Sequence, residues 1–211
     1  MAVVLKQPAG SPNSSNAKAT FEEFLRCEGE GEGRMEWVNG EIVRRPPAPK
    51  RHDELTAFLG DLLIPAAEMR VNGIVRCEPF VMRPSAESNG RSPDILVVRG
   101  EHRHRLRSRF LDGPADLVIE ISYPDSHKTD YVTKRDEYEA AGVSEYWIIE
   151  IELGEAAFLV LGEDNRYHLA EPQGDGRYAS AALDGLSIDP AWFAQETLPT
   201  VTEILTQWGL A

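Results

Sequence analysis

The sequence lacks the features that mark disulfide-stabilised, zinc-binding and membrane-spanning proteins. It contains only two cysteines, Cys27 and Cys77, which form no C-x-x-C pair, so neither a disulfide scaffold nor a zinc site is predicted. No apolar run approaches the ~20 residues that a membrane helix requires. The apolar stretch at residues 2–5 is too short for a secretory signal. We therefore expect a cytoplasmic protein that does not contact a membrane.

Positive charge is also scarce. The chain has 22 Lys and Arg against 35 Asp and Glu, a formal net charge of -13, whereas proteins that bind nucleic acid usually carry a basic surface. The acidic excess is uneven, however. Residues 145–211 hold twelve acidic residues and only two arginines, so residues 1–144, with 20 basic and 23 acidic residues, are close to neutral. The charge therefore argues against nucleic-acid binding mainly for the last third of the chain.

Length and composition predict one globular domain, since the 211 residues are 42% hydrophobic. Residues 6–18 are rich in Pro, Ser, Asn and Gly, so we expect a disordered arm over residues 1–19 and a single domain over residues 20–211. Thr20-Phe-Glu-Glu23 has the spacing of a capping box and predicts a short helix to about Arg26. Asn39-Gly40 predicts a type I′ hairpin turn within residues 35–43.

The remaining pattern predicts an α/β fold. Leucines at helical spacing over residues 55–63 indicate an amphipathic helix, which Pro65 would kink or shorten. Strands are predicted at residues 74–82, 93–99, 116–122, 145–151, 157–161 and 167–170, with short helices at 190–195 and 201–208. A helix from about Thr129 to the αL cap Gly142 joins two of these strands, which favours parallel pairing between them. We expect a central mixed sheet flanked by helices.

Two of the apolar strands each carry one carboxylate. Asp94 lies in Ser-Pro-Asp-Ile-Leu-Val-Val and Glu120 in Ala-Asp-Leu-Val-Ile-Glu-Ile-Ser. A Pro-Asp pair alone is more often a turn or a strand entry. Glu120 shares a strand face with Val118, where an unpaired carboxylate is costly, although Asp116 on the same face could make it partly wet. Lys134 lies one helical turn after Asp130 and either pairs with it in solvent or faces the two acids.

Two carboxylates and an ammonium are the groups that metal-assisted phosphodiester cleavage requires. Mg²⁺ prefers hard oxygen ligands and keeps several waters, so one or two carboxylates and a backbone carbonyl are sufficient. Asp94, Glu120 and the carbonyl of Ile121 are the candidate ligands for Mg²⁺ or Mn²⁺. Lys134 is the candidate group that would lower the pKa of the attacking water and stabilise the developing charge.

A basic segment follows the strand that carries Asp94. Residues 101–109 hold four arginines and two histidines against one glutamate. The segment is either a set of phosphate contacts or a solvated loop that offsets the acidic surface, and the two interpretations are about equally favoured. The candidate phosphate contacts are Arg103, Arg105, Arg107 and Arg109.

These motifs, taken together and in this order, carry a resemblance. Pro93-Asp94, Asp116-Leu-Val-Ile-Glu120-Ile-Ser-Tyr-Pro124 and the run from Asp130 to Trp147 resemble the Uma-two family of restriction-endonuclease-like proteins in the PD-(D/E)XK nuclease superfamily. The similarity also takes in Met35–Glu41, His52 and Leu183–Ile188 and covers nearly all of the chain after Thr20.

The resemblance implies a restriction-endonuclease-like core and a magnesium-dependent phosphodiesterase that acts on nucleic acid. We expect the nucleic acid to be DNA. Asp94 and Glu120 match the two family acids. The superfamily lysine normally lies two residues after the second acid, where this chain has Ser122, so Lys134 on the next helix becomes its substitute. Glu36 and His52 match further polar positions of the family. They are either an additional metal ligand or a phosphate contact, or else ordinary residues of the hairpin surface and the helix cap.

Two alternatives stay open at this point. The displaced lysine and the acidic charge also suit a nuclease fold that binds DNA or regulates without appreciable turnover. The other alternative is a small-molecule phosphoesterase or another hydrolase, but the sequence contains no nucleotide-pocket motif to support it. Cleavage of both strands of a duplex favours a symmetric pair of chains, so we expect a homodimer.

Overall fold

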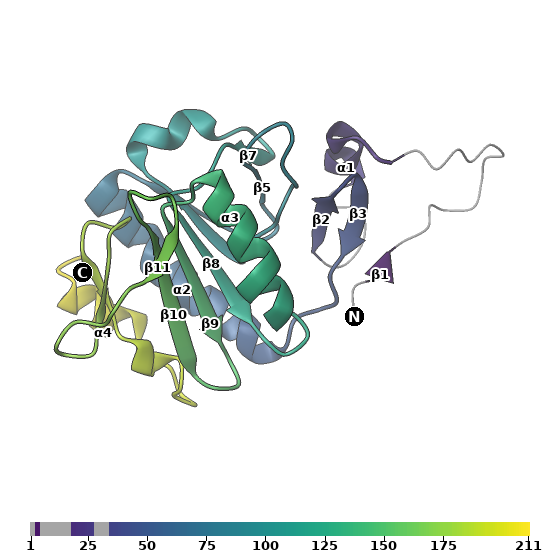
Figure 1. Cartoon of the computed structure of the whole chain (residues 1–211). Helices are drawn as coiled ribbons and strands as arrows, with labels where there is room; N and C mark the ends of the chain where they lie inside the picture. Colours follow the sequence, from purple (N-terminus) through teal and green to yellow (C-terminus); the bar gives the residue numbers. More distant parts are fainter. Residues whose placement is uncertain (1–2, 5–17, 28–33) are drawn as a thin grey trace.

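The computed structural model describes residues 3–4, 18–27 and 34–211 (Figure 1). Its α-helices are α1 (Phe21–Cys27), α2 (Lys50–Val71), α3 (Arg135–Ala141) and α4 (Val201–Gln207). Short helical turns are η1 (Gly100–Arg105), η2 (Thr129–Lys134) and η3 (Pro190–Trp192). The strands are β1 (Val3–Val4), β2 (Met35–Val38), β3 (Glu41–Arg44), β4 (Ile74–Cys77), β5 (Val81–Arg83), β6 (Ile95–Val98), β7 (Phe110–Asp112), β8 (Leu117–Ser122), β9 (Glu145–Glu150), β10 (Glu155–Leu161), β11 (Tyr167–Leu169), β12 (Tyr178–Ser180) and β13 (Leu186–Ile188).

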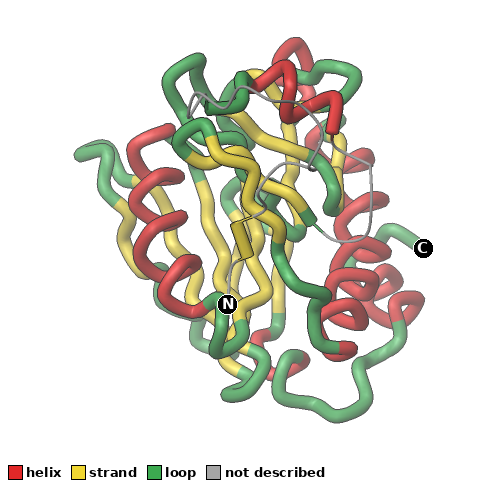
Figure 2. Tube along the Cα trace, turned by 90° about the vertical axis from the view of Figure 1, so that its right-hand side faces the viewer, coloured by secondary structure: helices red, strands yellow, loops and turns green. Residues whose placement is uncertain are grey.

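A mixed sheet forms the centre of the described part of the chain. Its strand order is β11-β10-β9-β8-β6-β4. β8 and β9 pair in parallel, as the strand–helix–strand pattern predicts, whereas the other neighbours are antiparallel. Helices lie on both sides of this sheet (Figure 2). The predicted fold class, a mixed sheet flanked by helices, is therefore confirmed.

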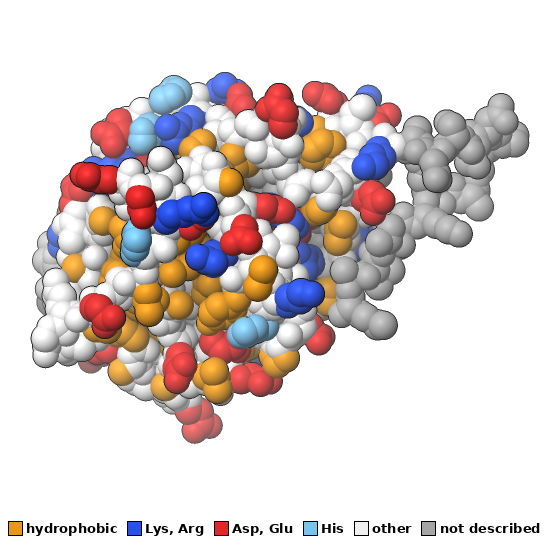
Figure 3. Space-filling model, viewed as in Figure 1, with side chains coloured by type: hydrophobic (Ala, Val, Ile, Leu, Met, Phe, Trp, Pro, Cys, Tyr) orange, Lys and Arg blue, Asp and Glu red, His pale blue; other side chains and the backbone are white. Residues whose placement is uncertain are grey.

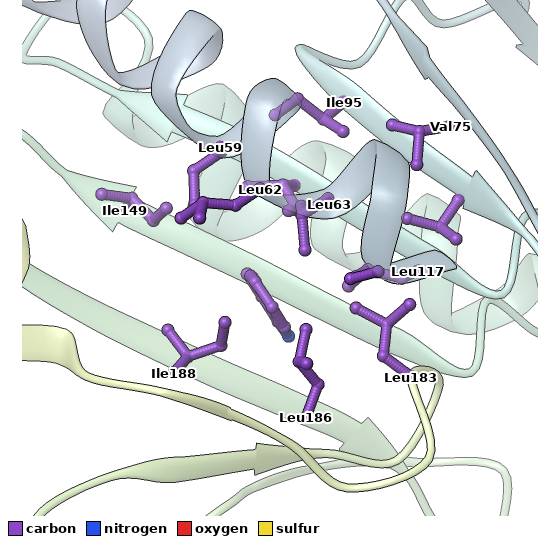
Figure 4. Close-up of a cluster of buried hydrophobic side chains, with 14 of the residues drawn as sticks. Leu59, Leu62, Leu63, Val75, Ile95, Leu117, Ile149, Leu183, Leu186 and Ile188 are labelled. Carbon is purple, nitrogen blue, oxygen red and sulfur yellow. The ribbon is translucent and has the colours of Figure 1, made fainter. Parts of the chain in front are cut away.

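Side-chain alternation on the central strands separates two apolar layers. Odd-numbered residues such as Ile95 and Ile119 pack against α2 in a core that also includes the C-terminal hairpin β12–β13 (Figure 4). Even-numbered residues such as Leu96 and Val118 pack with Tyr138 of α3 on the other side. Because successive residues of a strand point to opposite faces, Asp94 and Glu120 belong to the α3 side.

A smaller unit lies beside the sheet. β1, β3 and β2 form a three-stranded antiparallel sheet, and β5 and β7 pair in parallel. The β2–β3 hairpin turns through Asn39 and Gly40, whose φ angles of 52° and 82° are those that a type I′ turn needs. Trp37 forms a bridge with Gly90, so the hairpin is held against the segment that leads into β6.

Local capping signals are confirmed at two helices. At α1, the Thr20 amide donates to Glu23 Oε2 at 2.7 Å and the Glu23 amide donates to Thr20 Oγ1 at 3.2 Å, which is a capping box. α3 ends at Gly142, which is in the αL region with φ 81°. None of the described helices has the length and apolar content needed to cross a bilayer.

The single strand predicted across Pro79 is wrong, and of the two effects predicted for Pro65, a kink or a shorter helix, the shorter helix is wrong. The strand expected over residues 74–82 is two strands, β4 in the central sheet and β5 beside β7, because Pro79 has no amide hydrogen to continue the ladder. Pro65 does not shorten α2, which continues to Val71. Leu62, Leu63, Ala66 and Ala67 are fully buried around the proline, so their packing offsets the lost backbone hydrogen bond.

The N-terminal prediction falls mostly on residues outside the described ones. These are residues 1–2 and 5–17 of the expected arm. Within the arm, residues 3–4 form β1, which pairs with β3.

Candidate active site

Asp94 and Glu120 are cross-strand neighbours. β6 and β8 pair antiparallel with Ile95 opposite Ile119, so the next position outward places Asp94 opposite Glu120, on one face of the sheet. The Ile121 amide donates to Asp94 Oδ2 at 2.6 Å. The two acids are only 1% and 2% exposed. Two charged groups that are distant in sequence are thus held side by side in the interior.

Lys134 reaches the acids from the helix that covers this face. Its Nζ lies 2.7 Å from Glu120 Oε2 and 3.5 Å from Asp130 Oδ1. Both Lys134 and Asp130 are buried and belong to η2, a π-helical turn that runs directly into α3. π turns are rare and occur frequently at functional sites. The ammonium therefore faces Glu120 and Asp130 and not the bulk solvent.

Glu120 has a hydrogen-bond donor at each oxygen. Tyr138 of α3 donates its hydroxyl to Glu120 Oε1 at 2.8 Å, while Lys134 donates to Oε2. Burial raises the pKa of Glu120 to about 8, although the charge of Lys134 opposes this shift. Burial also disfavours the charged form of Lys134, but Glu120, Glu36 and Asp130 outweigh it and hold the Lys134 pKa above its ordinary value.

Asp94 is stabilised as a carboxylate from a different side. Its Oδ1 lies 3.0 Å from His52 Nε2 and 2.6 Å from a terminal nitrogen of Arg34. Burial alone would raise the pKa of Asp94, but the His52 hydrogen bond and the charges of His52, Arg34 and Lys134 lower it. The two neighbouring acids therefore have pKa values shifted in opposite directions, with Asp94 the more readily ionised.

Glu36 and His52, the two further candidates, both lie at this site. Glu36 of β2 is 3.4 Å from Lys134 and accepts hydrogen bonds from Arg45 at 2.8 Å and Arg91 at 2.9 Å. Burial opposes its ionisation, but Lys134, Arg91 and Arg45 hold the pKa of Glu36 well below its usual range. Three cationic side chains already neutralise Glu36, so it is better suited to positioning Lys134 than to binding a metal.

His52 comes from the first turn of α2 and is fully buried. Burial would lower its pKa, but hydrogen bonding to Asp94 and the charge of Asp94 raise it. His52 therefore holds Asp94 in place from the α2 side.

Sequence reasoning missed Arg34 and Glu78. Arg34 immediately precedes the predicted hairpin, and Glu78 lies in the middle of what looked like one strand. Neither stands out by periodicity, and only the break at Pro79 hints that residue 78 leaves the sheet. Burial, followed by the charge of Asp94, raises the pKa of Glu78 to about 7.

A small cavity opens between these groups. It encloses about 20 Å³, enough for one water-sized occupant. Ser92 Oγ, at its wall, is buried without a hydrogen-bond partner among the described residues. The residues that line this cavity are Arg34, Glu36, Arg45, Ser92, Asp94, Glu120, Ile121, Tyr123, Ser126, Asp130 and Lys134.

These groups fit a divalent cation. Asp94, Glu120 and Ile121 line the cavity, and carboxylate and carbonyl oxygens are the hard ligands that Mg²⁺ and Mn²⁺ prefer. The unpartnered Ser92 hydroxyl is the kind of group that bonds an ion-bound water. The ligand role of the Ile121 carbonyl remains a prediction.

The basic segment is not brought to this site. Asp94 precedes the first residue of β6, whereas the segment follows its last residue, so about 13 Å of strand separates them at ~3.3 Å per residue. The guanidinium groups of Arg103 and Arg105 donate to the backbone carbonyls of Gly73 and Pro114. Arg107 pairs with Asp112 at 2.8 Å. We therefore assign no phosphate at the acid pair to Arg103, Arg105, Arg107 or Arg109.

Surface charge is mixed rather than concentrated. On the face shown in Figure 3, basic and acidic side chains alternate over the helices and loops. The cations that contact the acid pair are instead Lys134, at 2.7 Å from Glu120, and the partly buried Arg34, at 2.6 Å from Asp94.

Comparison with known proteins gives one family and one fold. A family model described as "Uma2: Putative restriction endonuclease" matches residues 21–191. No curated protein matches the chain. A solved structure titled as a putative nuclease belonging to DUF820, from Anabaena variabilis ATCC 29413, is similar with a TM-score of 0.59 and 16% identity. The similarity covers 89% of this chain and 97% of that chain; at this identity it shows a shared fold.

Proposed function

This chain belongs to the Uma2 family, which is described as "Putative restriction endonuclease", and we propose that it is an endonuclease that hydrolyses phosphodiester bonds in DNA with the help of Mg²⁺ or Mn²⁺. The observation that carries the proposal is the convergence of Asp94, Glu120 and Lys134, three buried charged groups from three elements, around one small cavity. Such a cluster is costly to bury for packing alone.

Each residue has a distinct part in the proposed reaction. Asp94 and Glu120, with the Ile121 carbonyl, would hold the cation. A bound divalent cation supplies Lewis-acid catalysis, since it neutralises phosphate oxygens and makes water a stronger nucleophile near pH 7. Lys134, which contacts Glu120 at 2.7 Å, would orient the attacking water and stabilise the negative charge that develops.

The surrounding residues position this trio. Tyr138 fixes one oxygen of Glu120, and Glu36 and Asp130 hold the Lys134 ammonium between them. Arg45 and Arg91 in turn fix Glu36. Because each charged group has a partner, the carboxylates are oriented before substrate arrives, which reduces reorganisation during the reaction.

Cleavage of plasmid, linear and single-stranded DNA, with RNA for comparison, tests this function in Mg²⁺, Mn²⁺ and chelator. We expect cleavage only with a cation, and none by Glu120→Gln, which keeps the shape of the side chain but removes its charge. Glu155→Gln, an exposed carboxylate of β10, is the matched control. Full activity of folded Glu120→Gln would refute the assignment.

A nuclease fold without turnover is the second candidate. The observation that favours it is the 2.6 Å ion pair between Arg34 and Asp94, which places a side-chain cation at one of the proposed ligands. Thermal unfolding with and without Mn²⁺ separates the candidates, because a ligand that binds only the folded state raises the melting temperature. Stabilisation that is lost in Asp94→Asn supports the enzyme. DNA binding without stabilisation or cleavage supports the second candidate.

We further propose that the active form is a homodimer. One active site per chain cuts one strand, so a symmetric pair would cut both strands of a duplex. Light scattering coupled to size-exclusion chromatography measures the mass directly. A monomer that still produces double-strand breaks in a single event would contradict the dimer.

A further inference from the structure

One terminal nitrogen of Arg34 contacts three side chains of the kind that ligate metals. It lies 2.6 Å from Asp94 Oδ1, 3.0 Å from Glu78 Oε2 and 3.3 Å from His52 Nε2. The three acceptors come from different elements: Asp94 precedes β6, Glu78 follows β4 and His52 belongs to α2. Two carboxylate oxygens and one imidazole nitrogen thus converge on a single point, and a positively charged group stands there.

The contacts around the Arg34 terminal nitrogen resemble those of a metal-ion site more than those of an arginine–carboxylate ion pair. A guanidinium normally meets a carboxylate through two parallel hydrogen bonds, but here one nitrogen is shared by three groups. Glu78 Oε2 is buried and forms no directed hydrogen bond with any described residue, although it is within ion-pair distance of Arg34. A spherical charge would satisfy this oxygen without the directional requirement.

The far side of the His52 ring supports the same interpretation. His52 Nδ1 lies 3.4 Å from Asp53 Oδ1 and Nε2 lies 3.0 Å from Asp94 Oδ1, while ligand atoms of His52, Asp53 and Glu78 all lie within 4.8 Å of one another. Histidines that bind metals commonly present the other ring nitrogen to a carboxylate, which fixes the tautomer and the ring orientation. Asp53 therefore orients the imidazole, while Nε2 is directed at the Arg34 position.

We propose that the position of the Arg34 terminal nitrogen is a second divalent-cation site, ligated by Asp94, Glu78 and His52, for which Arg34 competes with the cation. The inference rests on the proposed function, because Asp94 serves both sites. Sites that share a carboxylate in this way are typical of two-metal phosphodiester hydrolysis. The imidazole ligand favours Mn²⁺ over Mg²⁺ at the second site.

Titration of the full chain with Mn²⁺ tests this by calorimetry, with electron paramagnetic resonance to count the free ion. We expect two ions per wild-type chain and one in Glu78→Gln, which retains the size of the side chain. Glu120→Gln should also bind one ion, since it removes only the first site. Glu155→Gln, far from both positions in the sheet order, should keep two.

Removal of the competing cation gives the sharpest result. Arg34→Gln should bind the second ion about tenfold more tightly than wild type, a normal size for coupling between two ligands of one site. The double variant Arg34→Gln/Glu78→Gln should lose that ion. Circular dichroism checks that each variant is folded, and Glu78→Gln in the wild-type background tests the site even when Arg34→Gln does not fold.

The outcomes separate this inference from the function on which it rests. One ion in both wild type and Arg34→Gln, removed by Glu120→Gln, would overturn the second site and leave the proposed metal site intact. Two ions in Glu78→Gln would also overturn it. Absence of Mn²⁺ binding in every variant would overturn the proposed function itself.

Discussion

Replacement of Lys134 by methionine distinguishes a catalytic lysine from a structural one. The change removes the ammonium from Glu120 at 2.7 Å, Glu36 at 3.4 Å and Asp130 at 3.5 Å. Glu36 keeps Arg45 and Arg91, whereas Glu120 keeps only the uncharged Tyr138 hydroxyl as a donor. Removal of one partner from a buried ion pair costs about 3–5 kcal/mol of stability. Here the loss depends on pH.

The direction of that dependence follows from the pKa of Glu120, which is raised to about 8 in the folded chain. A carboxyl whose pKa is higher in the folded state than in the unfolded state takes up a proton on folding. Its contribution therefore lowers the free energy of unfolding as the pH rises from the unfolded pKa to the folded pKa. At pH 5.5 Glu120 is protonated with or without Lys134. The destabilisation by Lys134→Met should therefore be about 1 kcal/mol larger at pH 8.5 than at pH 5.5, because at pH 8.5 the wild-type chain gains from ionising Glu120 beside Lys134 whereas Glu120 in the variant stays protonated.

Urea unfolding at the two pH values measures this difference, with Lys128→Met as the control because Lys128 is exposed and immediately precedes the same π turn. Cleavage should fall about 10²–10⁴-fold in Lys134→Met, the usual contribution of one group in proton transfer. Stabilisation by Mn²⁺ should persist, since the metal ligands remain. Equal destabilisation at both pH values, or cleavage at the wild-type rate, would refute the reasoning.

The remaining predictions concern ionisation, orientation and packing. Cleavage should increase with pH through about 8, because Glu120 must be ionised to bind the cation, and a flat pH–rate profile would contradict this. Tyr138→Phe removes a donor to Glu120, so this profile should move to higher pH, with a loss of about 1–2 kcal/mol in urea unfolding. Glu145→Ala should cost about 3–5 kcal/mol, since it leaves buried donors from Trp147, Tyr178, Ser180 and Ala182 unpaired, while Glu155→Ala should be nearly neutral in the same assay.

Much of the fold follows from short-range patterns. The capping box at Thr20, the hairpin at Asn39-Gly40 and the αL cap at Gly142 were predictable because each depends on the conformations of a few adjacent residues. The parallel pairing of β8 and β9 was also predictable, since a strand–helix–strand connection of this length favours it.

Three of the charged residues that the structure groups around one cavity were predictable, but their geometry and the neighbouring Arg34 and Glu78 were not. Asp94 and Glu120 stood out because a buried charge without a partner is costly and both lie in apolar strands. Lys134 stood out by its place on the helix that follows. The basic segment at residues 101–109 looked close to Asp94 by sequence, but the intervening strand carries it to the other end of the sheet. Proximity along an extended chain is a poor guide to contact, because every residue of strand adds ~3.3 Å.

The sequence by itself determined most of the strands and helices of the central sheet and which charged residues are costly to bury without a partner. Only the tertiary structure decided that Asp94 lies opposite Glu120, that a π turn brings Lys134 to Glu120, and that Arg34 contacts both Glu78 and His52. The physical reason is range: propensity and capping act within one turn, whereas strand register and the packing of a hairpin against a distant helix are set by the whole core at once.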